Sequence, residues 1–219
     1  SWARYTFGEI ARRINKLRKR TGAFWARRYS AEPILDDGAA WDKLTYLLAN
    51  PVQSHLVTEA KTWPGFSTLH EALGGQPRTF AWFDAEGFRR ASCGNKSVRK
   101  ADFTQHYSLR VAQLPDSEHL TPNQYAETLQ GLLTARQEEA AQCRKRSRRR
   151  VAPVDKLVRI RPTASPKQSK RSRRPLCHAT TLLAWKAYKA VYAAFKQAFA
   201  DAARALRKGQ ADVLFPSLA

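Results

Sequence analysis

The sequence predicts an α+β protein with four helices and two short strands. Apolar residues recur at helical spacing in four segments of the chain. Residues 78–84 (RTFAWFD) and 106–112 (HYSLRVA) instead have the aromatic and β-branched character of strands. The chain has 219 residues, of which 43% are hydrophobic, so one or two domains with a buried core are expected.

The first helix is expected to begin at residues 6–9 (TFGE), which match a capping box. Ile10, Ile14 and Leu17 would form its apolar face. Gly22 would end it, because glycine readily adopts the left-handed conformation after a helix. Basic side chains fill the remaining face, so this helix would present positive charge to its surroundings.

A second helix is expected over residues 38–50, with Asp36 or Asp37 as its N-cap. Pro51 should end or kink it, because proline lacks the backbone N–H that a helix needs. The apolar stripe of this helix consists of Trp41, Leu44 and Leu48.

Tyr46 falls outside this stripe. At about 100° per residue, Tyr46 lies roughly 140° from Trp41, and Asn50 lies only about 40° beyond Tyr46. Both side chains are therefore expected to face away from the core, together with Lys43. A phenol exposed in this way can attack phosphodiesters if a metal or base activates it, whereas most helical tyrosines only pack or hydrogen-bond.

Two more helices are expected in the second half of the chain. One begins at Thr121-Pro122, a favourable pair for the N-cap and the first helical position. The other spans residues 179–208 and ends at Gly209. Its apolar residues repeat with a period of about 3.5, which predicts that it docks on the body of the chain or on a second copy. This seam consists of Trp185, Tyr188, Tyr192, Phe195, Phe199, Ala202 and Leu206.

The charge of the chain favours a polyanionic partner. Lys and Arg number 39 against 18 Asp and Glu, which gives a net charge of +21 and a pI near 10.5. The excess is concentrated in residues 1–30 and 144–174. Nucleic acid is the expected partner, because Lys and Arg beside phosphates release condensed counterions. A membrane surface is disfavoured, since residues 144–174 have no interleaved apolar face.

Several other classes of protein are disfavoured. The cysteines, at positions 93, 143 and 177, form no CxxC pair, and the five histidines show no metal-ligand spacing. No glycine-rich phosphate loop, secretory signal or run of about eighteen apolar residues is present. Because the chain begins with Ser and contains no methionine, it is expected to be a fragment.

Residues 43–57 (KLTYLLANPVQSHLV) resemble the Y-x-x-x-N-P-V-x-x-x-L-V block of the REP-associated, insertion-sequence-200-like single-tyrosine (HUH) transposases. Residues 24–37 (FWARRYSAEPILDD) and 62–68 (TWPGFST) are similar to the segments that flank this block in the family. Residues 82–103 and 169–181 look like the C-terminal extension of one subgroup.

The resemblance implies a ferredoxin-like catalytic core that cleaves and rejoins single-stranded DNA through a 5′-phosphotyrosyl intermediate. Tyr46 would be the nucleophile, and Asn50 would lie next to a divalent metal, Mg²⁺ or Mn²⁺. In the family a His-hydrophobe-His pair holds this metal, and the present sequence contains no such pair. The chain is therefore expected to be an incomplete core followed by a mostly helical basic extension, inactive unless a partner molecule supplies the pair.

Four parts are expected along the chain. They are the C-terminal part of the catalytic domain (1–75), a mixed α/β extension (76–143), a basic disordered linker (144–178) and an amphipathic helix (179–208). The expected partners are single-stranded or hairpin DNA and a second copy of the chain, without a membrane, in the bacterial cytoplasm at the nucleoid. Expected phosphate contacts are Arg27, Arg28, Lys43, Arg144, Lys145, Arg146, Arg148, Arg149 and Arg150, each of which could also be a solvated surface charge.

Two alternatives remain open. The chain could be a non-catalytic nucleic-acid-binding protein, either a decayed relative derived from such a transposase or a binding module that uses the basic residues 144–174. It could also be an interaction protein built around its C-terminal helix.

Overall fold

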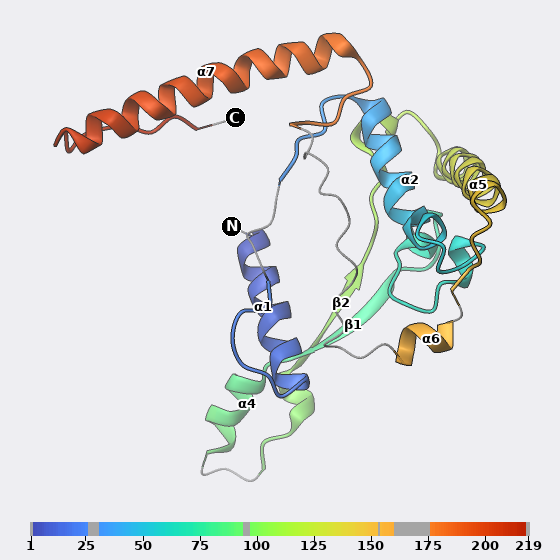
Figure 1. The fold of residues 1–219 in the computed structure, drawn as a ribbon. Helices are drawn as coiled ribbons and strands as arrows, with labels where there is room; N and C mark the ends of the chain where they lie inside the picture. Colours follow the sequence, from blue (N-terminus) through green and yellow to red (C-terminus); the bar gives the residue numbers. More distant parts are fainter. Residues whose placement is uncertain (1, 26–30, 94–96, 153, 160–175, 218–219) are drawn as a thin grey trace.

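The computed structural model describes residues 2–25, 31–93, 97–152, 154–159 and 176–217 (Figure 1). These residues form helices and one antiparallel sheet of two strands, which confirms the α+β class. Both strands lie beyond residue 75, so this sheet does not confirm a ferredoxin-like core in residues 1–75.

Helix α1 (Trp2–Leu17) begins earlier than the sequence predicted. The expected capping box at residues 6–9 was wrong, because the preceding residues, which include the strong helix formers Ala3 and Arg4, continue the helix toward the N-terminus. The helix also ends before Gly22, and Lys19 adopts a positive φ of 49°. Trp25 then returns to the helix, where its indole Nε1 donates a hydrogen bond to the carbonyl oxygen of Phe7 at 2.9 Å.

The core lies between α2 (Asp37–Gln53) and α5 (Pro122–Ser147), which pack against one another although they are far apart in the sequence (Figure 1). The ring centroids of Trp41 and Tyr125 lie 4.9 Å apart at this contact. The buried residues of this core are Leu48, Ala49, Ala72, Tyr125, Leu129 and Leu133, and a smaller cluster contains Val52, Val57, Ala60 and Ala140.

Both core helices begin where the sequence predicted. The Asp36 carboxylate accepts a hydrogen bond from the amide of Ala39 at 2.8 Å, and Thr121 forms a capping box with Gln124. Of the two expected effects of Pro51, an end or a kink, the end is excluded, since α2 continues to Gln53. Pro51 removes only one backbone hydrogen bond near the helix end, and the burial of Val52 in the core offsets that loss.

Short helical segments connect the core to the sheet. These are η1 (Ala60–Thr62), α3 (Leu69–Ala72), α4 (Ala85–Ser92), η2 (Lys100–Phe103) and η3 (Pro115–Ser117). Strand β1 (Arg78–Phe83) matches its prediction closely, whereas β2 (Thr104–Leu109) begins and ends earlier than expected. The two strands pair from Arg78 opposite Leu109 to Phe83 opposite Thr104.

The basic segment after α5 is partly helical. Residues 144–147, expected to open a disordered linker, form the last turn of α5, since Arg and Lys are good helix formers and their charge is favourable at a helix C-terminus. Arg148 then adopts a left-handed conformation, and α6 (Val154–Arg159) follows. Residues 160–175, the rest of the expected linker, lie outside the described part of the chain.

Residues 176–181, named here the bridge segment, return to the beginning of α2. Ile34 and His178 form a parallel β-bridge in which Leu35 N donates to His178 O at 2.9 Å and His178 N to Pro33 O at 2.8 Å. The Asp36 carboxylate also accepts hydrogen bonds from the amide and the hydroxyl of Thr180. The expected linker therefore ends in ordered structure.

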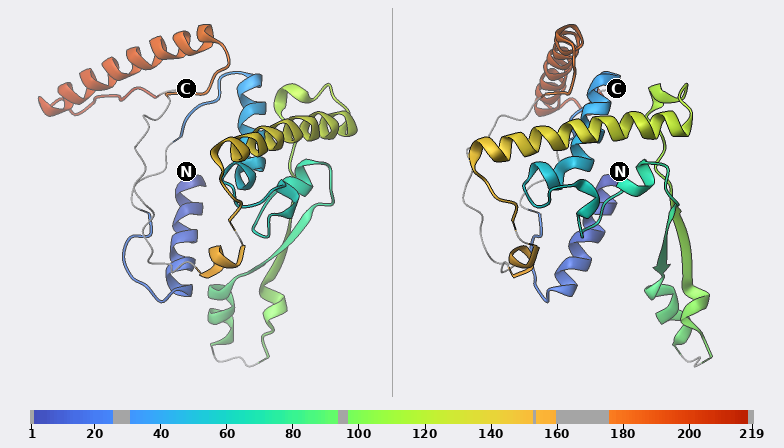
Figure 2. Two further views of the ribbon diagram at one scale, coloured as in Figure 1. Left: turned by 45° about the vertical axis from the view of Figure 1, so that its right-hand side comes forward. Right: turned by 90° about the vertical axis from the view of Figure 1, so that its right-hand side faces the viewer.

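Helix α7 (Leu182–Arg207) begins at the Thr181 N-cap and extends away from the α2–α5 pair (Figures 1 and 2). Gly209 follows the helix with a φ of 89°, as the sequence predicted. No residue of α7 is buried. The C-terminal residues turn back along the helix, and the ring centroids of Phe215 and Phe199 lie 5.0 Å apart.

Candidate nucleic-acid interface

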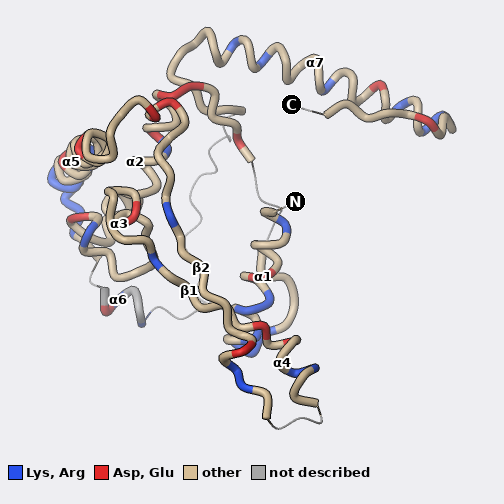
Figure 3. Tube along the Cα trace, turned by 180° about the vertical axis from the view of Figure 1, so that it is seen from behind, with Lys and Arg blue, Asp and Glu red and all other residues tan. Residues whose placement is uncertain are grey.

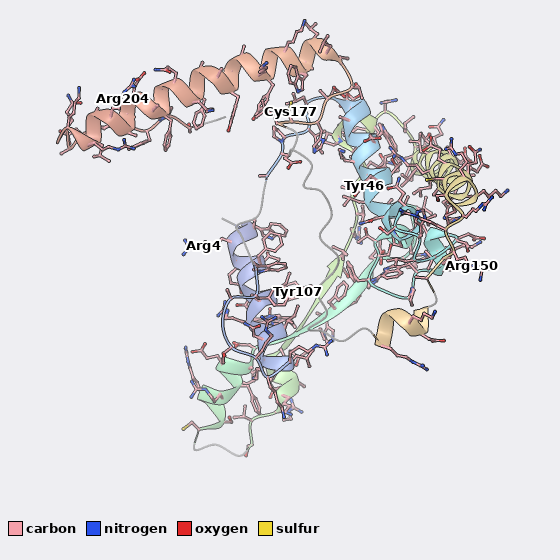
Figure 4. The ribbon with its side chains drawn as sticks, viewed as in Figure 1. Arg4, Tyr46, Tyr107, Arg150, Cys177 and Arg204 are labelled. Carbon is pink, nitrogen blue, oxygen red and sulfur yellow. The ribbon has the colours of Figure 1, made fainter. Side chains whose placement is uncertain are left out.

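Tyr46 lies on the outer face of α2. The buried residues in the second half of this helix (Thr45, Leu48, Ala49 and Val52) occupy the face that packs on α5 and neighbouring segments, and Tyr46 lies outside that face (Figure 4). Its side chain is 44% exposed, which confirms the exposure that the helical spacing predicted. A ligand can therefore reach the phenol without disturbing the core.

Lys43 places a cation beside this phenol. Its Nζ lies 5.7 Å from the centroid of the Tyr46 ring and 3.7 Å from a carboxylate oxygen of Asp42. An ammonium group in this position attracts a phosphate toward the tyrosine, and the neighbouring carboxylate partly offsets that charge. The structure thus brings together the two residues that the sequence assigned to the nucleophile and to a phosphate contact.

Asn50 lies one helical turn after Tyr46 and is exposed. Its Oδ1 accepts a hydrogen bond from the Ser54 hydroxyl at 3.0 Å. The sequence reasoning did not consider Leu47, which is 66% exposed on the same outer surface. The helical spacing could have identified it, since Leu47 falls about 120° from Trp41 and outside the apolar stripe.

The groups around Tyr46 do not fit a divalent metal site. Among the residues that the structure describes, no three His, Cys, Asp or Glu side chains lie close enough together to hold a metal ion. Asn50 would be a single amide ligand, and its oxygen already accepts a hydrogen bond from Ser54.

The arginine block, residues 144–150, lies near the C-terminal end of α2. Arg144 donates a hydrogen bond to Val52 O at 3.4 Å, and the Ala152 amide donates to His55 O at 2.9 Å. Figure 3 colours this end of α5 blue, the colour of Lys and Arg along the Cα trace. Figure 4 shows Arg150, the last residue of the block, apart from Tyr46.

The basic residues that the sequence predicted as phosphate contacts differ in how exposed they are. Arg144 is half-buried against α2. Arg27 and Arg28 lie outside the described residues. The members of the arginine block that remain exposed are Lys145, Arg146, Arg148, Arg149 and Arg150.

A groove runs between α2 and α5. It has a volume of about 590 Å³ and is lined in part by Trp41, Thr45, Leu132 and Arg136. Arg136 forms an ion pair with Asp42 across the two helices. The pair ties α5 to the helix that carries Tyr46, so it contributes to positioning rather than to chemistry.

The sheet carries a second exposed surface, which the sequence reasoning interpreted only as strand. Phe80 and Trp82 alternate along β1, and Tyr107 lies opposite Phe80 on β2 (Figure 4). All three side chains are at least 41% exposed. The period-two spacing of aromatic residues in RTFAWF was the available signal, because alternate residues of a strand share a face.

No protein-family model, curated protein or solved structure matches this chain. None of the helices in the described ranges has the length and apolar character needed to cross a bilayer.

Proposed function

We propose that this chain is part of a single-tyrosine DNA transposase that cleaves and rejoins single-stranded DNA, with Tyr46 as its nucleophile. The observation that carries the proposal is the exposed Tyr46 phenol with the Lys43 ammonium 5.7 Å from its ring. The net charge of +21 supports a nucleic-acid partner. The resemblance of residues 43–57 supports the family, its ferredoxin-like core and its place at the bacterial nucleoid.

The proposed reaction is a transesterification. The Tyr46 oxygen attacks the phosphorus of a phosphodiester, and the bond from phosphorus to the 3′ oxygen breaks. The products are a 5′-phosphotyrosyl link and a 3′-hydroxyl, which takes up the proton that the phenol loses. Lys43 would hold the phosphate by its charge, and rejoining is the reverse reaction with a new 3′-hydroxyl.

The test is the formation of a covalent adduct. The protein, expressed from its whole reading frame, is incubated with labelled single-stranded DNA and Mn²⁺, and the adduct is measured on a denaturing gel. We expect an adduct that Tyr46→Phe abolishes without weakening DNA binding, because this substitution removes only the hydroxyl. Tyr5→Phe, at a tyrosine 65% exposed on α1, is the matched control and should retain the adduct.

Two results would contradict the proposal. An adduct that persists in Tyr46→Phe would assign the nucleophile to another residue. Wild-type protein that binds DNA but forms no adduct would favour the second candidate, a non-catalytic single-stranded-DNA-binding protein.

This second candidate is favoured by the exposed arginine block, which lies apart from Tyr46. Replacing Arg148, Arg149 and Arg150 by Ala should weaken binding and lower the slope of log K against log[salt] by about 0.7 for each phosphate that the variant no longer neutralises. The charge-matched control replaces Arg204, Arg207 and Lys208 at the far end of α7. An equal weakening in both variants would mean that only total charge matters.

A further inference from the structure

One face of the β1–β2 ribbon is aromatic and uncovered. Phe80 and Trp82 lie on the same face of β1, because alternate residues of a strand point the same way. Tyr107 joins them from β2, directly opposite Phe80. Phe80 and Trp82 are each 41% exposed, and Tyr107 is 55% exposed.

The aromatic surface continues beyond the ribbon. Phe66, 68% exposed, has its ring centroid 6.4 Å from that of Phe80. The guanidinium of Arg78 lies 5.2 Å from the Phe66 ring and is held in place by an ion pair with the buried Glu71 at 2.8 Å. The four rings Phe66, Phe80, Trp82 and Tyr107 are named here the aromatic platform.

The opposite face of the ribbon is partly covered by other side chains. At its end, Phe83 packs on Phe88, which packs on Phe103, with ring centroids 5.5 and 5.8 Å apart. This small cluster covers part of one face, whereas no helix of the described residues buries the rings of the aromatic platform. Two strands alone are marginally stable, so an exposed aromatic face of this kind marks a binding surface.

The charge around the ribbon favours a polyanionic occupant. Asp84 caps α4, Glu86 pairs with Arg90, and Asp102 pairs with Arg99. Within the part of the chain that the structure describes, no ion pair involves the exposed residues Arg89, Lys100 and Arg110. Glu86 and Asp102 are therefore neutralised locally, and the chain segments at the ends of the ribbon carry more basic than acidic side chains.

We propose that the aromatic platform binds single-stranded DNA by stacking its rings on unpaired bases. Bases of a single strand expose the π-faces that duplex DNA keeps stacked, and the neighbouring basic residues would hold the phosphates. A second copy of this face is a poorer occupant, because self-pairing would bring the exposed basic residues at the ends of the ribbon, Arg89, Lys100 and Arg110, close to their own copies. This inference rests on the proposed function, since it assigns the surface that holds the DNA strand.

The test measures the affinity of the full chain for labelled oligo-dT by fluorescence anisotropy at several salt concentrations. Removal of one ring should weaken binding about 5- to 100-fold, the range expected when one stacked base loses its platform. Trp82→Thr and Tyr107→Thr are suitable variants, because both positions are half-exposed and Thr favours strands. The salt slope should not change, since the charges that hold the phosphates are untouched.

Two controls isolate stacking. His106→Thr removes a ring from the opposite face of β2 and should leave affinity unchanged. Trp82→Phe keeps an aromatic ring and should restore most of the affinity that Trp82→Thr loses. Circular dichroism and urea unfolding of each variant confirm that the fold is intact.

The outcomes separate the platform from the proposed function. If wild-type protein does not bind oligo-dT, both are overturned. If it binds and the Trp82 and Tyr107 variants bind equally well, the platform is wrong while the function stands. If these variants instead change the sedimentation of the protein without changing its DNA affinity, the platform is wrong and the face is an interface between copies.

Discussion

Leu132 and Leu133 are adjacent residues of α5 with opposite surroundings. Leu133 is 2% exposed in the core between α2 and α5, whereas Leu132 is 39% exposed and lines the groove between these helices. Leu133→Ala should lower the free energy of unfolding by about 2–5 kcal/mol, because it leaves a cavity in the core. Leu132→Ala should lower it by about 1 kcal/mol or less.

Urea unfolding of the two variants measures this difference. Both substitutions remove the same atoms from the same helix, so each is the other's control. Equal decreases in stability would contradict the packing of α5 on α2.

Whether a side chain is exposed or buried could be predicted where it depends only on the position of the residue around its helix. The exposure of Tyr46 and the burial of Leu48 follow from an angle of about 100° per residue. The exposure of Leu132 could not be foreseen in this way, because it depends on how closely α2 approaches α5. The hydrogen bond from Ser54 to Asn50 depends on the helix passing through Pro51, which the sequence did not predict.

Among the elements, the N-terminus of α2 and the bridge segment depend on one carboxylate. Hydrogen bonds from the amide of Ala39 and from Thr180 hold the pKa of Asp36 below its ordinary value of 3.8. A lowered pKa means that the charged form stabilises the folded state. This stabilisation is complete above pH 3.8 and is lost as the pH falls through the lower pKa of the folded state.

Asp36→Asn should therefore be less stable than wild type near neutral pH, and the difference should shrink below pH 3.8. Thermal unfolding across this range measures the effect, with Asp212→Asn in the exposed C-terminal segment as control. Asp37 acts in the opposite sense, because a hydrogen bond with Asp116 raises its pKa; the charge of Asp36 is a further, smaller cause of that rise, which Asp36→Asn removes. A constant difference at all pH values would contradict the role of the Asp36 charge.

The helix ends that are set by neighbouring residues in the sequence were predicted best. The Thr121 capping box and the Gly209 end of α7 both depend on a few adjacent residues. The early start of α1 could not be foreseen, because TFGE matches a helix start although its neighbours also favour helix. The bridge segment could not be foreseen either, since its hydrogen bonds join residues 144 apart in the sequence.

For the whole molecule, α7 is the element through which we expect any self-association to occur. The aromatic rings of Tyr188, Tyr192, Phe195 and Phe199 contact one another in succession along this helix. None of these residues is buried, although Phe215 of the C-terminal segment contacts Phe199. We expect this seam to pair with a second copy. A chain that ends at Thr181 should then be monomeric while its affinity for single-stranded DNA is largely retained, because the arginine block and the aromatic platform remain.

Sedimentation equilibrium of the two chains tests this expectation. The end point matters, because a chain that stops at Pro175 would also lack the bridge segment, which would weaken the start of α2. Full-length Tyr188→Ser with Phe195→Ser should have the same effect as the truncation. If the wild-type chain is already monomeric, the exposed seam does not hold two copies together.

The bridge segment also has a consequence for the order in which the chain assembles. Its contacts close a loop that contains α2, the sheet and α5, and closing so long a loop costs more conformational entropy than forming a local contact. The pairing of α2 with α5 also spans a long stretch, but its many buried side chains offset that entropy, whereas the bridge buries little besides Cys177 and otherwise contributes hydrogen bonds and the contact of His178 with Glu32. The last helix should therefore acquire its fixed attachment late, after the interior has formed, and should be the first part to detach under stress.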